Sequence, residues 1–178
     1  MLESVRVRIL PLTYTQLLTY LEAKDMLEGE LGLTPTGRTI SENVKEMVES
    51  FTLVKMKDAS YNDYLYHTFW IVVDKITNSI VAELGFKGPP DHYGYVEIGY
   101  GTMPQQQRKG FMTEAVSLLT KWAFGRRGIK GVIAEVDEFN TASLRVVEKN
   151  GFKQYEKRGR MLWWKKTIVS KNDVRLRY

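Results

Sequence analysis

The chain has 178 residues, a formal net charge of +5 and no cysteine. This length predicts one domain, residues 1–178, large enough to bury about two thirds of the surface that the unfolded chain exposes. The missing cysteines exclude disulfides, thiolate metal ligands and a cysteine nucleophile. His67 and His92 stand outside any ligand-like spacing, so we expect no metal site.

Charge and hydropathy narrow the class of partner. The positive charge suits an anionic ligand, but it is spread from Arg6 to Arg177 without a long block of one sign, so we expect no direct contact with nucleic acid. No apolar run approaches the roughly 20 residues of a membrane span, and residues 1–6 lack the features of a secretory signal. We therefore expect no membrane partner and a cytoplasmic location.

Hydrophobic periodicity predicts the elements in chain order. Residues 5–10 alternate apolar and basic side chains, which is typical of a half-buried strand near a sheet edge. Helices are predicted over 13–27 and over 40–56, the second beginning near Ser41 and turning Ile40, Val44, Met47, Val48 and Phe51 toward the core. The patterns then predict strands at 69–73, 79–86 and 93–102, a helix at 109–125, a strand at 131–136, a helix at 141–149 and strands at 152–158 and 161–169. This order predicts an α+β domain: a mixed, mostly antiparallel sheet of about six to seven strands, with a β-α-β unit and flanking helices.

A polar, basic turn at residues 104–110 runs directly into the helix predicted at 109–125. The first N–H groups of a helix have no intrahelical partner and carry about half a positive charge, so they favour an anion. Gly110 allows positive φ and a close approach to the backbone, and Arg108 and Lys109 add two cations. An ordinary glycine turn before a helix gives the same pattern, so the turn alone leaves both interpretations open.

A second motif runs from Asn140 to Phe152. Asn140 is a good residue to cap the start of a helix, and Gly151 is a good residue to end one. These two structural roles explain the residues without any ligand.

The two motifs together resemble the GNAT superfamily of N-acetyltransferases, in particular the branch that acetylates the N-termini of ribosomal proteins. Members carry a Gln/Arg-x-x-Gly-x-Gly/Ala turn between the fourth strand and the third helix, and residues 107–112 (QRKGFM) fall at that place. Arg108 stands where glycine is common, and Met112 stands where a small residue is usual. The flanking segments 98–100 (IGY), 110–115 (GFMTEA) and 122–124 (WAF), and the NTAS run at 140–143, also resemble that branch.

The resemblance implies acetyl-coenzyme A as the acetyl donor. Its pyrophosphate would lie on the N–H groups of the turn, and its pantetheine arm would pair with the end of the fourth strand near Tyr100 and Thr102. Asn140 would reach the same arm in addition to capping its helix. The cofactor-binding residues predicted in this way are Tyr100, Thr102, Gln107, Arg108, Lys109, Gly110, Phe111, Met112, Thr113, Asn140 and Ser143.

For catalysis the resemblance implies direct attack of an amine on the thioester. Glu97 is the first candidate for the base, acting through water, and Glu83 is the second; a solvated or salt-bridged strand residue is the alternative for Glu97. Ser143 is expected to position the sulfur or a water. Many relatives use a tyrosine as general acid at the position of Val147, so the commonest acid is absent from this sequence.

The acceptor would be a protein N-terminal amine or a small-molecule amine, entering between the early helices and the strand ends. A terminal amine has a reference pKa of about 7.7 to 8.0 against about 10.4 for lysine, so it needs less help from a base. Aromatic residues that are candidates for lining this entrance, or for the core, are Tyr61, Tyr64, Tyr66, His67, Trp70, Trp163 and Trp164. A monomer or a homodimer is expected. A catalytically weak acetyl-CoA sensor of the same fold is the alternative function.

Overall fold

The computed structural model describes residues 1–22, 25–60 and 63–168, and the statements below concern these residues. Tyr61 and the C-terminal tail from Ser170 lie outside them. None of the described helices is long and apolar enough to cross a membrane.

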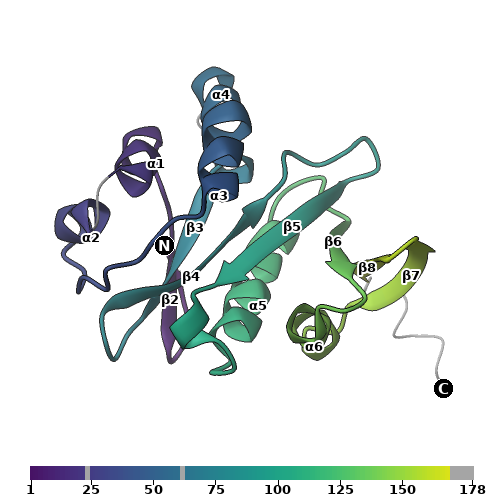
Figure 1. Ribbon diagram of the computed structural model, residues 1–178. Coiled ribbons are helices and arrows are strands. Elements are labelled where there is room, and N and C mark those ends of the chain that lie inside the picture. The colour runs from purple at the N-terminus through teal and green to yellow at the C-terminus, as the bar shows by residue number, and fades with distance from the viewer. Residues whose placement is uncertain (23–24, 61–62, 169–178) are drawn as a thin grey trace.

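The described strands form one mixed sheet (Figure 1). In spatial order the strands are β1 (Leu2–Glu3), β2 (Val7–Pro11), β3 (Phe69–Asp74), β4 (Ser79–Phe86), β5 (Tyr95–Thr102), β6 (Gly131–Asp137), β8 (Met161–Thr167) and β7 (Lys153–Arg158). Only β5 and β6 pair in parallel; all the other neighbouring strands are antiparallel. This confirms the α+β class with a mostly antiparallel sheet. The described chain has eight strands rather than six to seven. The additional strand is β1, whose two residues are too few to produce a recognisable sequence pattern.

The helices differ from the predictions at two places. The helix predicted at 13–27 is divided into α1 (Tyr14–Leu21) and α2 (Met26–Leu31), and Asp25, in front of α2, takes a left-handed φ of 62°. The second predicted helix is α3 (Glu42–Met47), a π-helical turn (Val48–Thr52) and α4 (Leu53–Asp58). A π turn takes more residues than an α turn and shifts the buried stripe. Val48 is therefore buried as predicted, whereas Met47 and Phe51 are exposed.

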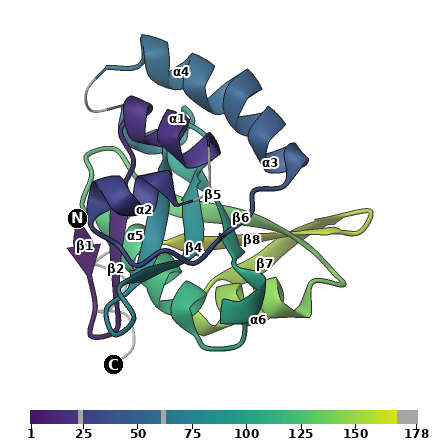
Figure 2. The same cartoon turned by 60° about the vertical axis from the view of Figure 1, so that its left-hand side comes forward.

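Two layers of helices cover the sheet (Figure 2). One face packs against α5 (Phe111–Phe124) and α6 (Thr141–Lys149), with α5 supplying apolar side chains such as Ala115 and Leu119. The other face packs against α1 to α4 over a separate core that contains Leu17 and Ile71. Each face thus has its own hydrophobic cluster, and the sheet separates the two groups of helices.

The pairing of β5 with β6 stops halfway along the strands. Tyr95, Val96 and Glu97 pair with residues 131–133, but beyond Glu97 strand β5 continues beside β4 only, and β6 continues beside β8 only. Two neighbouring parallel strands that part in this way leave the facing backbone groups of β5 without a strand partner. This splay lies in the middle of the sheet.

Candidate active site

The turn before α5 presents a run of unused backbone donors. The N–H groups of residues 108–113 donate no hydrogen bond to any residue that the structure describes, and the first bond of the helix runs from Glu114 N to Gly110 O at 3.3 Å. No side chain caps α5, because its N-cap residue is Gly110. A capping serine or aspartate would use one of these donors. Six consecutive free N–H groups at the start of a 14-residue helix suit an anion such as a pyrophosphate.

Two residues of this turn adopt the left-handed conformation. Arg108 has φ 64° and Gly110 has φ 84°. Left-handed backbone is easy for glycine and strained for most other residues. Arg108, which stands where the sequence resemblance would place a glycine, therefore keeps a glycine-like backbone while it adds a positive charge.

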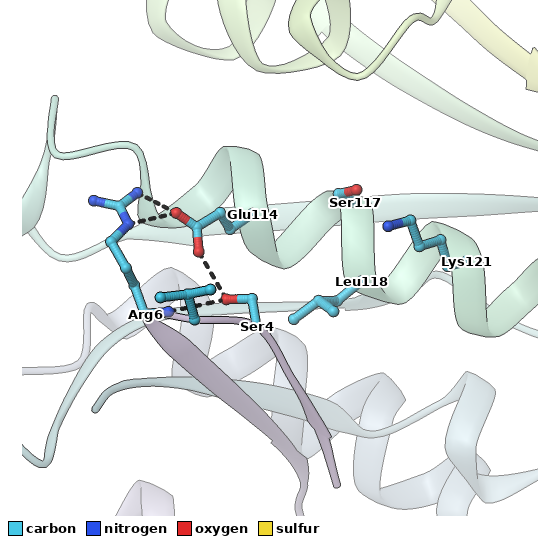
Figure 3. A pocket seen from close by; sticks show the side chains of 7 residues that line it. Ser4, Arg6, Glu114, Ser117, Leu118 and Lys121 are labelled. Carbon is cyan, nitrogen blue, oxygen red and sulfur yellow. Dashed lines mark hydrogen bonds and ion pairs between the residues drawn. The ribbon is translucent and has the colours of Figure 1, made fainter.

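The side chain of Arg6, on the turn between β1 and β2, reaches across to the start of α5 (Figure 3). Its Nη1 donates to Lys109 O at 3.0 Å, and its guanidinium pairs with Glu114 of α5. Ser4 Oγ also donates to Glu114, at 2.7 Å. These contacts border an open pocket of about 440 Å³ on the outer side of α5. Sequence reasoning missed Arg6, because its only local signal was the alternation of a strand.

The predicted residues of β5 and α6 meet on the α5–α6 side of the sheet. The side chain of Asn140 accepts a hydrogen bond from Ser143 N at 3.0 Å, which confirms it as the cap of α6. The Tyr100 hydroxyl donates to Ser143 O at 3.2 Å, and burial raises the pKa of Tyr100 to about 12. Asn150 donates to Thr113 O at 3.2 Å and joins the end of α6 to the start of α5. The structure therefore brings Tyr100, Asn140 and Ser143 together beside the splay.

Glu97 lies on the opposite face of β5, because side chains alternate along a strand. Its carboxylate pairs with the ammonium of Lys87, which also lies 3.4 Å from Glu135. Burial opposes the charge on Lys87, but its contacts with Glu97 and Glu135 outweigh burial and raise the pKa of Lys87. Glu97 and Ser143, the two predicted catalytic residues, thus approach the sheet from opposite faces.

Glycines leave β5 bare on the face that carries Glu97. A methyl group added at Gly101 would meet only Glu83 Oε1 within 4 Å, at 3.6 Å, and one added at Gly99 would meet only Lys87 Cε, at 4.0 Å. We call Gly99 and Gly101 the glycine strip. It lies between Glu83 and the Lys87–Glu97 pair, so a small group can approach the splayed end of β5 from this side.

Glu83 belongs to a buried network with the early part of the chain. Its Oε2 accepts a hydrogen bond from the Tyr20 hydroxyl at 2.9 Å. Arg38 lies over the Tyr20 ring, 4.1 Å from its centre, and donates to Tyr20 O and to Glu28. Burial raises the pKa of Glu83, although Tyr20 and Arg38 counteract part of the effect. Burial also raises the pKa of Tyr20, and the charge of Glu83 adds to it, so this phenol stays protonated.

A second, smaller pocket lies near the same network. It has about 110 Å³ and lies between residues 36–39 and residues 103–106, and Ile80 also lines it. It therefore joins the Arg38 segment to the turn that leads to α5.

Most of the described aromatic candidates belong to the core. Tyr66 and Trp70 pack against Trp122 of α5, with ring centres 5.4 Å and 5.3 Å apart, and belong to the core. Trp163 and Trp164 point to opposite faces, because side chains alternate along a strand: Trp164 lies in the α5–α6 core, and Trp163 pairs with Glu135 on the face of Glu97. Val147 is fully buried in the core of α6.

Comparison with known proteins agrees with this arrangement. The acetyltransferase (GNAT) domain family matches residues 11–153. A Bacillus subtilis (strain 168) protein named as an uncharacterised N-acetyltransferase is 32% identical over 123 residues, which is 69% of this chain and 71% of that protein.

Solved structures show the same fold. An acetyltransferase from Salmonella typhimurium, described as modifying the N-terminal serine of ribosomal protein L7/L12, superposes with a TM-score of 0.61 at 18% identity and covers 93% of this chain and 97% of its own. The Campylobacter jejuni N-acetyltransferase PseH, solved with acetyl-coenzyme A, has a TM-score of 0.62 at 16% identity and covers 91% of this chain and 100% of its own.

The chain belongs to the GNAT family of acetyltransferases. It is an acetyl-CoA-dependent acetyltransferase.

Proposed function

We propose that this enzyme transfers the acetyl group of acetyl-CoA to a primary amine by direct attack within a ternary complex. The observation that carries the proposal is the position of the six free N–H groups of residues 108–113 relative to the splay between β5 and β6. One feature suits a pyrophosphate, and the other offers unpaired strand backbone to an amide-containing arm. Together they suit the two ends of coenzyme A.

The cofactor would extend from the turn before α5 to the splay between β5 and β6. Gln107, Arg108, Lys109, Gly110, Phe111, Met112 and Thr113 would surround the pyrophosphate. Tyr100 and Thr102 of β5 would border the pantetheine arm on one side, and Asn140 and Ser143 of α6 on the other. Arg6 would add a positive charge beside Gly110, because a methyl group at that glycine would lie 3.1 Å from its Nη2.

The acceptor would approach from the α1–α4 side, over the glycine strip. The amine nitrogen forms the new bond to the acetyl carbon while the C–S bond breaks, and a backbone N–H of the splayed β5 would stabilise the oxyanion. No cysteine exists to form an acyl-enzyme. Two carboxylates, Glu83 and Glu97, border the glycine strip and are the candidate proton acceptors, as predicted from the sequence.

We propose a protein N-terminal amine as the acceptor, with a small-molecule amine as the second candidate. The Salmonella typhimurium protein of the same fold modifies an N-terminal serine, and a terminal amine loses its proton more easily than a lysine does.

Release of free thiol from acetyl-CoA, measured with a panel of amines, tests the proposal. The panel would contain peptides with a free N-terminus, the same peptides with a blocked N-terminus, polyamines, aminoglycosides and amino acids. We expect thiol release with free N-termini and none with blocked ones. Acetyl-CoA binding in calorimetry without thiol release from any amine would instead establish the sensor function.

A further inference from the structure

We propose that Glu83 is the residue that takes the proton from the acceptor amine, and that Tyr20 is the positioning residue that aims it. This inference rests on the proposed function and selects between the two carboxylates at the glycine strip. It gives the early helices a direct part in the chemistry.

The two carboxylate oxygens of Glu83 differ in their contacts. Oε2 is occupied by the Tyr20 hydroxyl at 2.9 Å, whereas Oε1 has no hydrogen-bond partner in the described part of the chain. Oε1 is also the atom that a methyl group at Gly101 would meet, at 3.6 Å. One oxygen is therefore held in place, and the other points over bare backbone, where an amine can reach it.

Glu83 and Glu97 differ in the partner that each carboxylate already has. Glu97 already has a cation, because the ammonium of Lys87 pairs with it. A substrate ammonium would have to displace Lys87, which also contacts Glu135 at 3.4 Å. The partner of Glu83 is a neutral phenol, so its charge is available to an incoming ammonium. Burial raises the pKa of Glu83, which makes it a stronger proton acceptor than an ordinary glutamate.

Neighbouring side chains hold Tyr20 in place. Its ring packs edge-on to Phe69, with centres 5.8 Å apart, and lies under the guanidinium of Arg38. Arg38 is fixed in turn by Glu28, at 2.8 Å, and both side chains are almost completely buried. The charged and titratable groups facing Glu83 are thus Tyr20 from α1 and Arg38 from the segment before α3, with Glu28 of α2 behind them.

The bonds and protons of the proposed transfer balance with Glu83 as the proton acceptor. The ammonium gives one proton to Glu83 Oε1, and the free amine attacks the acetyl carbon. The C–S bond then breaks, and its electron pair leaves with the sulfur. The remaining extra proton on the nitrogen goes to this thiolate. The products are the acetylated amine, the free thiol of coenzyme A and a proton on Glu83 that is lost to water.

The test measures kcat and kcat/KM against pH for the wild type and for Glu83→Gln, Glu97→Gln and Tyr20→Phe, with acetyl-CoA affinity measured by calorimetry. A base must be ionised, so activity falls as the pH falls through the pKa of Glu83, and burial places this acidic limb above the ordinary range of a glutamate. Glu83→Gln should lower kcat by about 100-fold, remove the acidic limb and leave cofactor affinity unchanged. Glu97→Gln should keep the limb.

Tyr20→Phe separates positioning from packing. The hydrogen bond from Tyr20 lowers the pKa of Glu83, so its loss should move the acidic limb to higher pH. A merely structural role would leave the limb in place.

Normal turnover by Glu83→Gln, or loss of the limb in Glu97→Gln alone, would overturn the inference while the proposed function stands. If the wild type released no thiol from any amine, both would fall together.

Discussion

The two faces of the sheet build their parts of the site in different ways. On the α5–α6 face the candidate cofactor site is made mostly of backbone groups: residues 108–113 offer N–H groups, and β5 offers its splayed edge. On the α1–α4 face the candidate acceptor site is made of side chains, in which Glu83, Tyr20 and Arg38 come from three separate segments. Backbone N–H and C=O groups are the same whichever side chain a residue carries. The acceptor site, in contrast, depends on the identity of its side chains.

This difference predicts how each face responds to change. The cofactor face should tolerate substitutions that keep the backbone conformation, as the left-handed Arg108 already illustrates. On the acceptor face, removal of a single polar atom should have a large effect. In a charged network with little solvent, no water can replace the hydrogen-bond partner that is lost.

The largest effect is expected where the acceptor face is anchored. Arg38→Met should lower the free energy of unfolding by about 3 kcal/mol or more, because it leaves the fully buried Glu28 without its cation. Arg6→Met is the matched control on the other face: its pair with Glu114 is partly exposed, so we expect a loss of about 1 kcal/mol or less. Urea unfolding measures both. Equal losses would mean that burial does not distinguish the two ion pairs.

The next effect concerns the anion site. Gly110→Asp should weaken acetyl-CoA binding by about 100-fold, because the carboxylate would repel the phosphates and compete for the free N–H groups. Gly110→Asn has nearly the same shape without the charge and should keep most of the affinity. Gly159→Asp is a control for strain alone, because Gly159 has φ 58° and open space around its Cα. Equal calorimetric affinities for Gly110→Asp and Gly110→Asn would mean that the phosphates of acetyl-CoA do not bind at this turn.

The fold could be predicted wherever neighbouring residues carried the pattern. The strands at 69–73, 79–86 and 131–136 and the helix at 141–149 are found within a residue or so of their predicted bounds. The break between α1 and α2 and the π turn could not be read, because neither Asp25 nor Val48–Thr52 carries a glycine or proline that would mark it. Tertiary packing decides such interruptions.

The site could be predicted to the same extent. The turn at 107–113 is one continuous segment of the chain, so its pattern could be recognised in the sequence. The hydrogen bond between Tyr20 and Glu83 joins residues 63 positions apart, and the contact of Arg6 with Lys109 joins residues 103 positions apart. No local pattern marks such pairs. Tyr20 in particular looks like an ordinary core position of a helix, and only the structure shows where its hydroxyl points.

A tenfold effect is expected at the glycine strip. Gly101→Ala adds one methyl group beside Glu83 Oε1 at an ordinary van der Waals distance, so the protein should fold normally. We expect kcat/KM for the amine to fall by about tenfold, the usual effect of one methyl group in a fitted site, with acetyl-CoA affinity unchanged. Gly29→Ala in α2 is the control: open space surrounds Gly29, so activity should be unchanged and stability should rise by about 0.5–1 kcal/mol. Unchanged kcat/KM in Gly101→Ala would place the acceptor elsewhere.

The smallest effect separates two roles of Asn140, a residue of the cofactor face whose side chain is proposed both to cap α6 and to bind the pantetheine arm. Asn140→Ala removes the hydrogen bond to Ser143 N and should lower stability by about 1 kcal/mol. Asn140→Ser restores a capping oxygen and should recover most of that loss, but its side chain is too short to reach the pantetheine arm as well. If Asn140 binds the arm, both variants lose acetyl-CoA affinity several-fold although only one is destabilised. If affinity instead follows stability across the two variants, Asn140 is a helix cap alone, and its side chain does not bind the pantetheine arm.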